Sequence, residues 1–530
     1  MAVGSLGAFL GCRAFRAKPT AKDQPERVFH LSVAIEAFEA DPDLIPTLSR
    51  AGVGHIWLAP FFGGYWHYSI EKVNSWRTRL EAAGFQVHLI TIPLGHPSFS
   101  AAAPDYMPKM DLSRRKAALT VDGKTFYGVS LHSPACQENV AAMPTLKRAQ
   151  PGTVFLDDDF RLALGPGTIG GCFCDEHKSA FLRKYGYGEQ QWQELHDAVI
   201  ARRLTPVVAQ WVDFTCDSLT ECFRAQQAAA APEMALGIMV MYLGSEKAGI
   251  RLADYTGVPM RVGELMFDDA SFAPIKGKTN ELFSVLFHRR YTTPALAYSE
   301  TTAWPAEKLS AQNMAAKLAT STIADVRNTM FMSGIRPFPR THWETLAPAM
   351  REQALMHRKV MGHKPHGPLK HFWGRHSRYV GDDNPYSLFL AMGIPFEVID
   401  SASIDCKEGW VFLADADARG VATGDTKIHG QPELVYRPEA QVQLARGRAV
   451  AESPAGLAKL RQAILQQTGR YPYVEEDAPV VCAWYPTARQ VLLWNLTEAP
   501  QPVTLNLTRI GGDRRSVAIQ ALRTALIEYR

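Results

Sequence analysis

Three consecutive carboxylates, Asp157, Asp158 and Asp159, directly follow a short apolar run at residues 154–156. Such a run is typical of a strand that a parallel sheet buries on both faces. Adjacent acids repel one another, and folded chains keep them mainly where cations, hydrogen bonds or chemistry stabilise them. A solvated loop that caps the next helix is the alternative. Because the acids lie at the carboxyl end of a predicted strand, we favour a functional site.

Further acids fall on other predicted strands of the same sheet. Glu36 follows the first strand, Glu264 lies on the sixth, and Glu300 closes the seventh. In a closed barrel the carboxyl ends of the strands meet at one mouth, so acids on strands four and seven face each other. Two such carboxyl groups can cleave a glycosidic bond: one protonates the leaving oxygen, and the other attacks the anomeric carbon or activates water. Metal-dependent and aldolase barrels carry such pairs too, so the pattern leaves those classes open.

Aromatic residues near the same predicted mouth favour a sugar as the ligand. Trp66 follows the second strand, and Tyr298 and Trp304 flank Glu300. An aromatic face suits the C–H face of a pyranose, whereas packing in the barrel is the alternative for each ring. The candidate substrate-binding residues are Asp157, Arg161, Trp66, Tyr298, Trp304, Glu264 and Glu36.

Two thiols and an imidazole lie close together in the sequence just before a predicted helix. Cys172, Cys174 and His177 have a spacing that suits Zn²⁺, and Cys136 is the candidate fourth ligand, with His132 in reserve. A closed shell of nitrogen and sulfur ligands leaves no position for water, so this metal is predicted to be structural. The alternative is two buried free thiols beside a surface histidine.

The elements that must position these residues alternate between strand and helix from residue 27 onward. Helices are predicted at 43–51, 69–84, 176–185, 206–231 and 310–324, and a hairpin at 119–131 turns on Asp122-Gly123. Eight strand–helix units predict a TIM barrel with insertions. A doubly wound open sheet is the alternative, but no Gly-rich phosphate loop follows the first strand. The predicted strands lie at 28–35, 55–59, 86–92, 153–156, 236–242, 260–266, 293–300 and 327–333.

Beyond the barrel, the pattern predicts two smaller domains. The barrel spans 27–362, a small α/β domain spans 363–475, and strands dominate the C-terminal domain at 476–530. Alternating apolar residues and Pro/Gly turns in this last domain favour a small β-sandwich.

Composition excludes several functional classes. The 530 residues include 57 basic and 53 acidic side chains, a net charge of +4, which gives no electrostatic footprint for nucleic acid. The sequence contains no apolar stretch long enough for a transmembrane segment.

Residues 1–26 consist of an apolar segment that ends at Cys12, followed by a basic tether. This pattern favours a truncated export or lipoprotein signal. Such a signal would favour a bacterial periplasmic or cell-surface location over the cytoplasm. A disordered N-terminus is the alternative.

The segment Leu156-Asp-Asp-Asp-Phe160, followed by Cys172-x-Cys174-x-x-His177, resembles glycoside hydrolase family 42, the β-galactosidases of clan A. That family shows Asp-Asn-Glu-aromatic after strand four, then Cys-x-Cys-x-x-Cys. The resemblance implies that Asp158 takes the place of the Asn and Asp159 that of the acid/base Glu.

The segment from Tyr298 to Pro305 is similar to the nucleophile segment of the same family, which implies Glu300 as nucleophile. The family's order of barrel, α/β domain implicated in trimerisation and β tail matches the order predicted above, which implies a homotrimer acting on a carbohydrate, with structural zinc and no organic cofactor.

The departures from the family pattern imply a divergent relative. Asp159 is one methylene shorter than Glu, so proton donation needs a shifted backbone, a different position of the leaving group, or Asp158 or Asp157 as the acid instead. His177 replaces the third Cys. We therefore predict a retaining, exo-acting glycosidase on a β-galactoside-like substrate. An inverting enzyme using the Asp cluster, a non-catalytic carbohydrate-binding relative and a metal-dependent hydrolase remain open.

Overall fold

The computed structural model describes residues 27–62, 65–92, 118–126, 135–157, 160–240, 243–262, 266–400, 409–467 and 469–530. The predicted leader at 1–26, the acids Asp158, Asp159 and Glu264, and His132 lie outside the described residues. Within the described part of the chain, no helix combines the length and the apolar composition that crossing a membrane requires.

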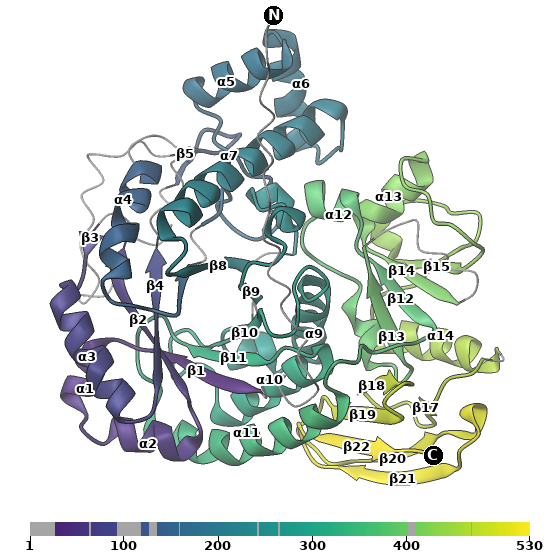
Figure 1. The fold of residues 1–530 in the computed structure, drawn as a ribbon. Helices are drawn as coiled ribbons and strands as arrows, with labels where there is room; N and C mark the ends of the chain where they lie inside the picture. Colours follow the sequence, from purple (N-terminus) through teal and green to yellow (C-terminus); the bar gives the residue numbers. More distant parts are fainter. Residues whose placement is uncertain are drawn as a thin grey trace, which may run out of the picture.

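Eight parallel strands form a closed barrel, which confirms the predicted TIM barrel and excludes the open sheet (Figure 1). The ring closes because the first strand pairs with both the second strand and the last. A two-residue strand, β3 (Tyr65–Trp66), adds antiparallel to the carboxyl end of β2. The barrel strands are β1 (Val28–Ser32), β2 (His55–Phe62), β4 (Gln86–Ile92), β7 (Thr153–Leu156), β8 (Ala235–Val240), β9 (Met260–Val262), β10 (Ala297–Thr302) and β11 (Asn328–Met332).

Helices cover the outside of the barrel and bury the outward-facing side chains of the strands, such as Leu31, Ile56 and Val154. Ser69, Thr205 and Ser310 cap three of these helices through their hydroxyl groups, as their positions before apolar periodic stretches predict. The covering helices are α1 (Ile35–Ala40), α2 (Leu44–Ala51), α3 (Ile70–Ala82), α4 (Ala135–Lys147), α7 (Pro206–Ala230), α8 (Asp269–Phe272), α9 (Ile275–His288), α10 (Ala311–Ala324) and α11 (Arg340–Val360).

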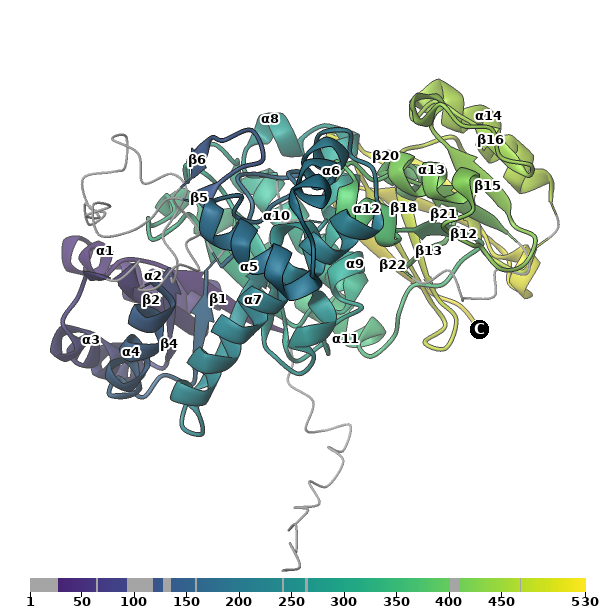
Figure 2. The same ribbon diagram turned by 90° about the horizontal axis from the view of Figure 1, so that it is seen from above.

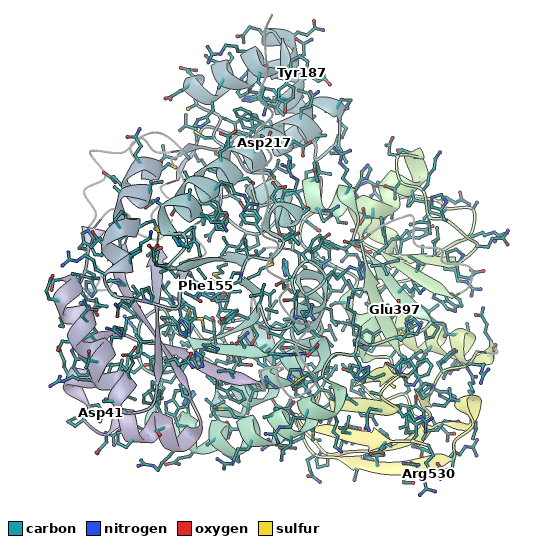
Figure 3. All side chains as sticks on the ribbon, viewed as in Figure 1. Asp41, Phe155, Tyr187, Asp217, Glu397 and Arg530 are labelled. Carbon is teal, nitrogen blue, oxygen red and sulfur yellow. The ribbon has the colours of Figure 1, made fainter. Side chains whose placement is uncertain are left out.

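Two further helices, α5 (Asp175–Tyr185) and α6 (Glu189–Ile200), pack on the amino-terminal part of α7 and project from the barrel (Figures 1 and 2). Their own small core contains Phe181, Trp192 and Trp211. Figure 3 shows the Tyr187 side chain in this projection, far from Phe155 in the strand ring.

Among the helices of twelve or more residues, the sequence did not predict α4, α6, α9 or α11. Pro144 lies inside α4 and Pro348 inside α11, and an internal proline argues against a helix unless packing compensates for the lost hydrogen bond. The seventh strand was placed too early, because Thr293–Leu296 form a turn before β10 begins. Glu300 therefore lies inside the strand, two residues before its end.

Inside the barrel, alternate residues of the strands form a core that is separate from the helix-facing core. Trp57, Phe155, Tyr298 and Met330 fill its middle. Nearer the amino ends of the strands, His30, His55 and His88 come together. Burial lowers the pKa of His55 to about 4 and that of His88 to about 3. Burial and the other two imidazoles hold the pKa of His30 well below its ordinary value.

The predicted α/β domain is a five-stranded parallel sheet with the doubly wound order 2-1-3-4-5. Asp417 lies buried at the point where the strand order reverses, and it accepts hydrogen bonds from the backbone N–H groups of Gly374 and Ser377. Burial raises the pKa of Asp417 to about 6. The sheet order is β13 (Phe396–Ile399), β12 (Leu369–Phe372), β14 (Trp410–Leu413), β15 (Glu433–Tyr436) and β16 (Gly447–Ala449), and the helices are α12 (Arg375–Val380), α13 (Asp415–Thr423) and α14 (Pro454–Gln466).

Two three-stranded antiparallel sheets form the C-terminal domain and bury Cys482, Leu493 and Leu505 with other apolar residues in one cluster, as predicted for a sandwich. Hydrogen bonds of Gly393 to Val480 and Val474 join this domain to the α/β domain. One sheet contains β17 (Tyr473–Val474), β20 (Gln501–Asn506) and β21 (Arg514–Ile519), and the other contains β18 (Val480–Tyr485), β19 (Gln490–Asn495) and β22 (Thr524–Glu528).

A buried ion pair fastens the α/β domain to the mouth of the barrel. Asp383 accepts hydrogen bonds from the backbone N–H groups of Gly167 (2.9 Å) and Gly244 (2.8 Å) and pairs with the Lys247 ammonium. The side chains of Lys247 and Asp383 are both almost fully buried. Because Gly167 follows β7 and Gly244 follows β8, this carboxylate holds two loops at the carboxyl ends of the barrel strands.

We expect the substitution Asp383→Asn to lower the free energy of unfolding by roughly 3–5 kcal/mol, because it leaves the buried Lys247 ammonium without a counter-charge. Urea unfolding of the full chain measures the loss. The control is Asp382→Asn, which changes the exposed neighbouring acid and should cost no more than about 0.5 kcal/mol. Equal stability of the two variants would contradict the role assigned to Asp383.

Candidate active site

Glu300 lies in the carboxyl half of β10 and belongs to the inward-facing set of barrel residues. Its side chain is almost completely buried, with 2% of the residue exposed. The Thr302 hydroxyl donates a hydrogen bond to Oε1 of Glu300 at 2.7 Å. The strand and this hydroxyl together fix the direction of the carboxylate, as a group that must attack a defined atom requires.

A fully buried arginine on β9 connects two of the predicted acids. The Arg261 guanidinium donates a hydrogen bond to Asp157, and its Nε lies 4.0 Å from Oε2 of Glu300. Its Cζ also lies 5.8 Å from the centre of the Phe155 ring. A guanidinium remains charged in proteins, so Arg261 brings a permanent positive charge between two carboxylates in the barrel.

Sequence reasoning missed Arg261. Its neighbours Met260 and Val262 are apolar, and our interpretation of this strand concentrated on Glu264. The available signal was an arginine within a strand predicted to be buried, because charged side chains are seldom buried unless they are paired.

Asp157 begins the acidic cluster directly after β7. Its N–H donates to the carbonyl of Thr91 (2.8 Å), and its own carbonyl accepts from the N–H of Phe160 (2.9 Å). Its carboxylate is buried and pairs with Arg261, so the contacts described for Asp157 are structural. Arg161, also buried, follows in the same segment. These backbone contacts fix Asp157 at the carboxyl ends of β4 and β7.

Two tryptophans remain accessible at the same end of the barrel. Trp66 on β3 is 40% exposed, and its ring lies 5.0 Å from that of Phe61. Trp304, just after β10, is 44% exposed, and its backbone N–H donates to the carbonyl of Phe267. A Cβ added at Gly334 would lie 3.2 Å from the Trp304 ring, so this glycine leaves room for the ring. Firmly supported, accessible rings are suitable platforms for a sugar face.

Of the remaining predicted binding residues, Tyr298 lies in the barrel interior and Glu36 lies on a covering helix. Tyr298 packs in the barrel interior, 4.9 Å from the Phe155 ring, and burial raises its pKa to about 12. Glu36 lies in α1, where Tyr68 and Lys72 donate hydrogen bonds to its carboxylate. Although partial burial raises the pKa of Glu36, these bonds hold it below its ordinary value. Direct contact of Tyr298 or Glu36 with a substrate stays a prediction.

A second buried ion pair supports the strand ends around the site. The Lys317 ammonium lies 2.8 Å from Glu281 and donates to the carbonyls of Met266 (2.8 Å) and Thr302 (3.4 Å). Glu281 in turn accepts from the N–H of Met266 (2.9 Å). This pair therefore connects the segment after β9 to the end of β10, which carries Glu300.

The structure brings together three of the four predicted metal ligands. Ligand atoms of Cys172, Cys174 and His177 all lie within 4.8 Å of one another, and the Cys174 sulfur is 3.2 Å from Nδ1 of His177. Two sulfurs and one nitrogen at this range fit three positions of a tetrahedral zinc site. Burial raises the pKa of Cys172 to about 12, so zinc would have to displace a proton from this thiol.

Cys136, the predicted fourth ligand, does not belong to this group of three. It lies on α4 and exchanges a hydrogen bond with Cys222 on α7. Because these two helices pack closely, the two thiols meet between them. The three-residue set therefore stands without a fourth protein ligand among the described residues, and zinc binding stays a prediction.

Comparison with solved structures places this site in a known architecture. The chain superimposes on a catalytic mutant of Gan42B, a GH42 beta-galactosidase from G. stearothermophilus, with a TM-score of 0.55 and 10% sequence identity over 95% of this chain and 98% of that chain. A second Gan42B structure gives a TM-score of 0.50 and 12% identity over 96% and 99%. The chain has the fold of a GH42 beta-galactosidase. No protein-family model and no curated protein matches its sequence.

This likeness confirms the fold that the motifs implied. The superposition covers 95% of this chain, so it extends over the barrel, the α/β domain and the β tail. At 10–12% identity, the likeness concerns the path of the chain, so the roles of individual residues depend on the geometry described above.

We expect the substitution Arg261→Met to lower the free energy of unfolding by roughly 3–5 kcal/mol, because it removes the charge that compensates Asp157 and Glu300 in the barrel. Urea unfolding measures this loss. Arg340→Met is the matched control, since it removes an exposed arginine paired with Asp41 and should change the unfolding midpoint little. If Arg261→Met unfolds at the same urea concentration as the control, the buried pair does not stabilise the site.

We expect the substitution Cys174→Ser to remove one equivalent of bound zinc and to lower the melting temperature, because zinc would join the segment after β7 to α5. Metal analysis of protein purified without chelator measures the first effect, and thermal unfolding measures the second. Cys482→Ser, which alters a buried thiol in the C-terminal domain, should leave the zinc content unchanged. Equal zinc content in the wild type and Cys174→Ser would refute the assignment.

Proposed function

We propose that the protein is a retaining glycoside hydrolase that acts on the non-reducing end of a β-galactoside or a related glycoside. The observation that carries the proposal is the carboxylate of Glu300, buried at the barrel mouth, oriented by Thr302 and 4.0 Å from the permanent charge of Arg261. A neighbouring positive charge favours the ionised form of a carboxyl group, which is the form that attacks an anomeric carbon.

In the first step, an oxygen of Glu300 forms a bond to the anomeric carbon while the glycosidic bond breaks. Asp159 gives its proton to the departing oxygen, so the leaving group departs as an alcohol. In the second step, Asp159 takes a proton from water, and the resulting nucleophile displaces Glu300 from the sugar. The anomeric configuration is retained after two inversions.

The chain's other residues would bind and orient the sugar. Trp66 and Trp304 offer accessible rings at the mouth, and Arg261 with Thr302 holds the nucleophile in place. The β-galactosidase fold of the solved relatives supports the substrate class. Asp159 is one methylene shorter than the glutamate of the GH42 motif, so proton transfer requires a shifted backbone or a different position of the leaving oxygen.

We expect the substitution Glu300→Gln to lower kcat/KM on an aryl β-galactoside, or on whichever aryl glycoside the wild type cleaves, by at least about a thousandfold, because the amide is a very weak nucleophile. Glu307→Gln, an exposed neighbour, is the control and should retain wild-type activity. Hydrolysis of a panel of aryl glycosides and unfolding of each variant are measured together. Wild-type activity of Glu300→Gln on every cleaved sugar would refute the assignment.

Product stereochemistry tests the mechanism separately. NMR of the first-formed sugar should show the substrate's own anomer, and azide added to Glu300→Ala should yield a glycosyl azide of opposite configuration. An inverted first product would identify an inverting enzyme that uses the Asp cluster. Sugar binding without turnover of any aryl glycoside would identify a carbohydrate-binding relative.

A further inference from the structure

A second cluster of possible metal ligands lies inside the barrel, nearer the amino ends of the strands than Glu300 is. His30, His55 and His88 come from β1, β2 and β4, which are neighbours in the ring. His30 is the register partner of His55, and His88 is the partner of Trp57. One ring nitrogen of each histidine lies within 4.8 Å of the other two.

Hydrogen bonds fix the tautomer of His30. The Asn328 side-chain amide donates to the carbonyls of Ala295 and Ala297 at 3.0 Å each, so its Oδ1 is free to accept. Nε2 of His30, 3.2 Å from this oxygen, therefore carries the proton. Nδ1 is left with a lone pair, which accepts from the Trp57 indole N–H at 3.0 Å. An imidazole held by a donor bond on one nitrogen and bearing a lone pair on the other is the usual state of a metal ligand.

His55 and His88 meet with nitrogen facing nitrogen. Nδ1 of His55 lies 2.9 Å from Nε2 of His88, and the two rings are nearly parallel, at 6°. Nδ1 of His88 is buried and has no hydrogen-bond partner among the described residues. Whichever of the two nitrogens carries the shared proton, the apo pair leaves one nitrogen of His88 unsatisfied. A bound cation would take the place of the shared proton, which would move to the outer nitrogen of its own ring, so that both neutral rings bind through lone pairs.

We propose that His30, His55 and His88 form a binding site for a divalent transition-metal ion of the zinc type, separate from the cysteine cluster. Three imidazoles suit Zn²⁺, Ni²⁺ and Cu²⁺, whereas Ca²⁺ and Mg²⁺ need oxygen ligands. Each imidazole would bind the ion through the lone pair of one ring nitrogen. His55 is only half-buried, which leaves room for a water molecule as the fourth ligand.

The ion would stabilise the barrel without taking part in the proposed reaction. It would connect β1, β2 and β4 where the pairing of β1 with β2 closes the ring. On β2, Trp57 lies two residues nearer the mouth than His55, and it packs with Phe155 and Tyr298 in the barrel interior. Binding of the ion through Nδ1 of His30 would also replace the hydrogen bond from the Trp57 indole. The fluorescence of Trp57 should therefore change when the ion binds.

The test uses the full chain carrying Cys174→Ser, so that the cysteine cluster cannot take the ion. After chelation and dialysis, this protein is titrated with Zn²⁺ and with Ni²⁺. We expect one equivalent to bind, the melting temperature to rise, and Ni²⁺ to quench tryptophan fluorescence. His429→Ala in the same background, which changes an exposed histidine, should behave identically.

In the same background, we expect His88→Ala to weaken binding at least about tenfold and to abolish the rise in melting temperature. His55→Gln, a half-buried and more conservative change, gives the same test if His88→Ala fails to fold. The proposal is overturned if Cys174→Ser binds no metal ion. It is equally overturned if a folded variant at either histidine binds the ion as tightly as the background protein. Neither result depends on glycosidase activity.

Discussion

The charge of Arg261, enclosed in the barrel, is the constraint on which the proposed active site depends. A guanidinium cannot lose its charge at physiological pH, so its burial requires carboxylates close by. Asp157 satisfies it directly, and Glu300 lies within 4.0 Å. Strands four, six and seven of the barrel are thus connected by one electrostatic cluster. The fold keeps Glu300 oriented because moving it would leave the arginine less well compensated.

The same principle operates around the barrel mouth. Lys317 with Glu281, and Lys247 with Asp383, are further buried pairs, and each also binds backbone groups of a loop or a strand end. Loops at a barrel mouth are usually the most variable part of the fold. Here buried charges hold the segments after β7, β8 and β9, so the surroundings of Glu300 are set by contacts distant in sequence.

Local patterns predicted the fold well, because strand and helix periodicity and the hydroxyl caps of α3, α7 and α10 agree with the tertiary structure. They failed at α4 and α11, where packing tolerates an internal proline, and at β10, whose start depends on a turn. For the site, the sequence predicted Glu300 as a catalytic acid and Cys172, Cys174 and His177 as neighbouring metal ligands, and the structure describes all four. Spacing alone could not show which acids Arg261 contacts, since β9 pairs with β10 and β8, whereas Asp157 follows β7, one strand further along the sheet.

The small α/β domain carries a buried acid at the place where many doubly wound sheets bind a ligand. In this topology, the crevice between the first and third strands is where a phosphate-bearing ligand usually sits. Asp417 fills that position and accepts the backbone N–H groups of Gly374 and Ser377 that would otherwise face an anion. The carboxylate of Asp417 thus takes the place that the phosphate of a bound ligand would have in this crevice. Because an acid already fills this crevice, the role that the contacts show for the domain is to join the barrel, through Asp383, to the β tail, through Gly393.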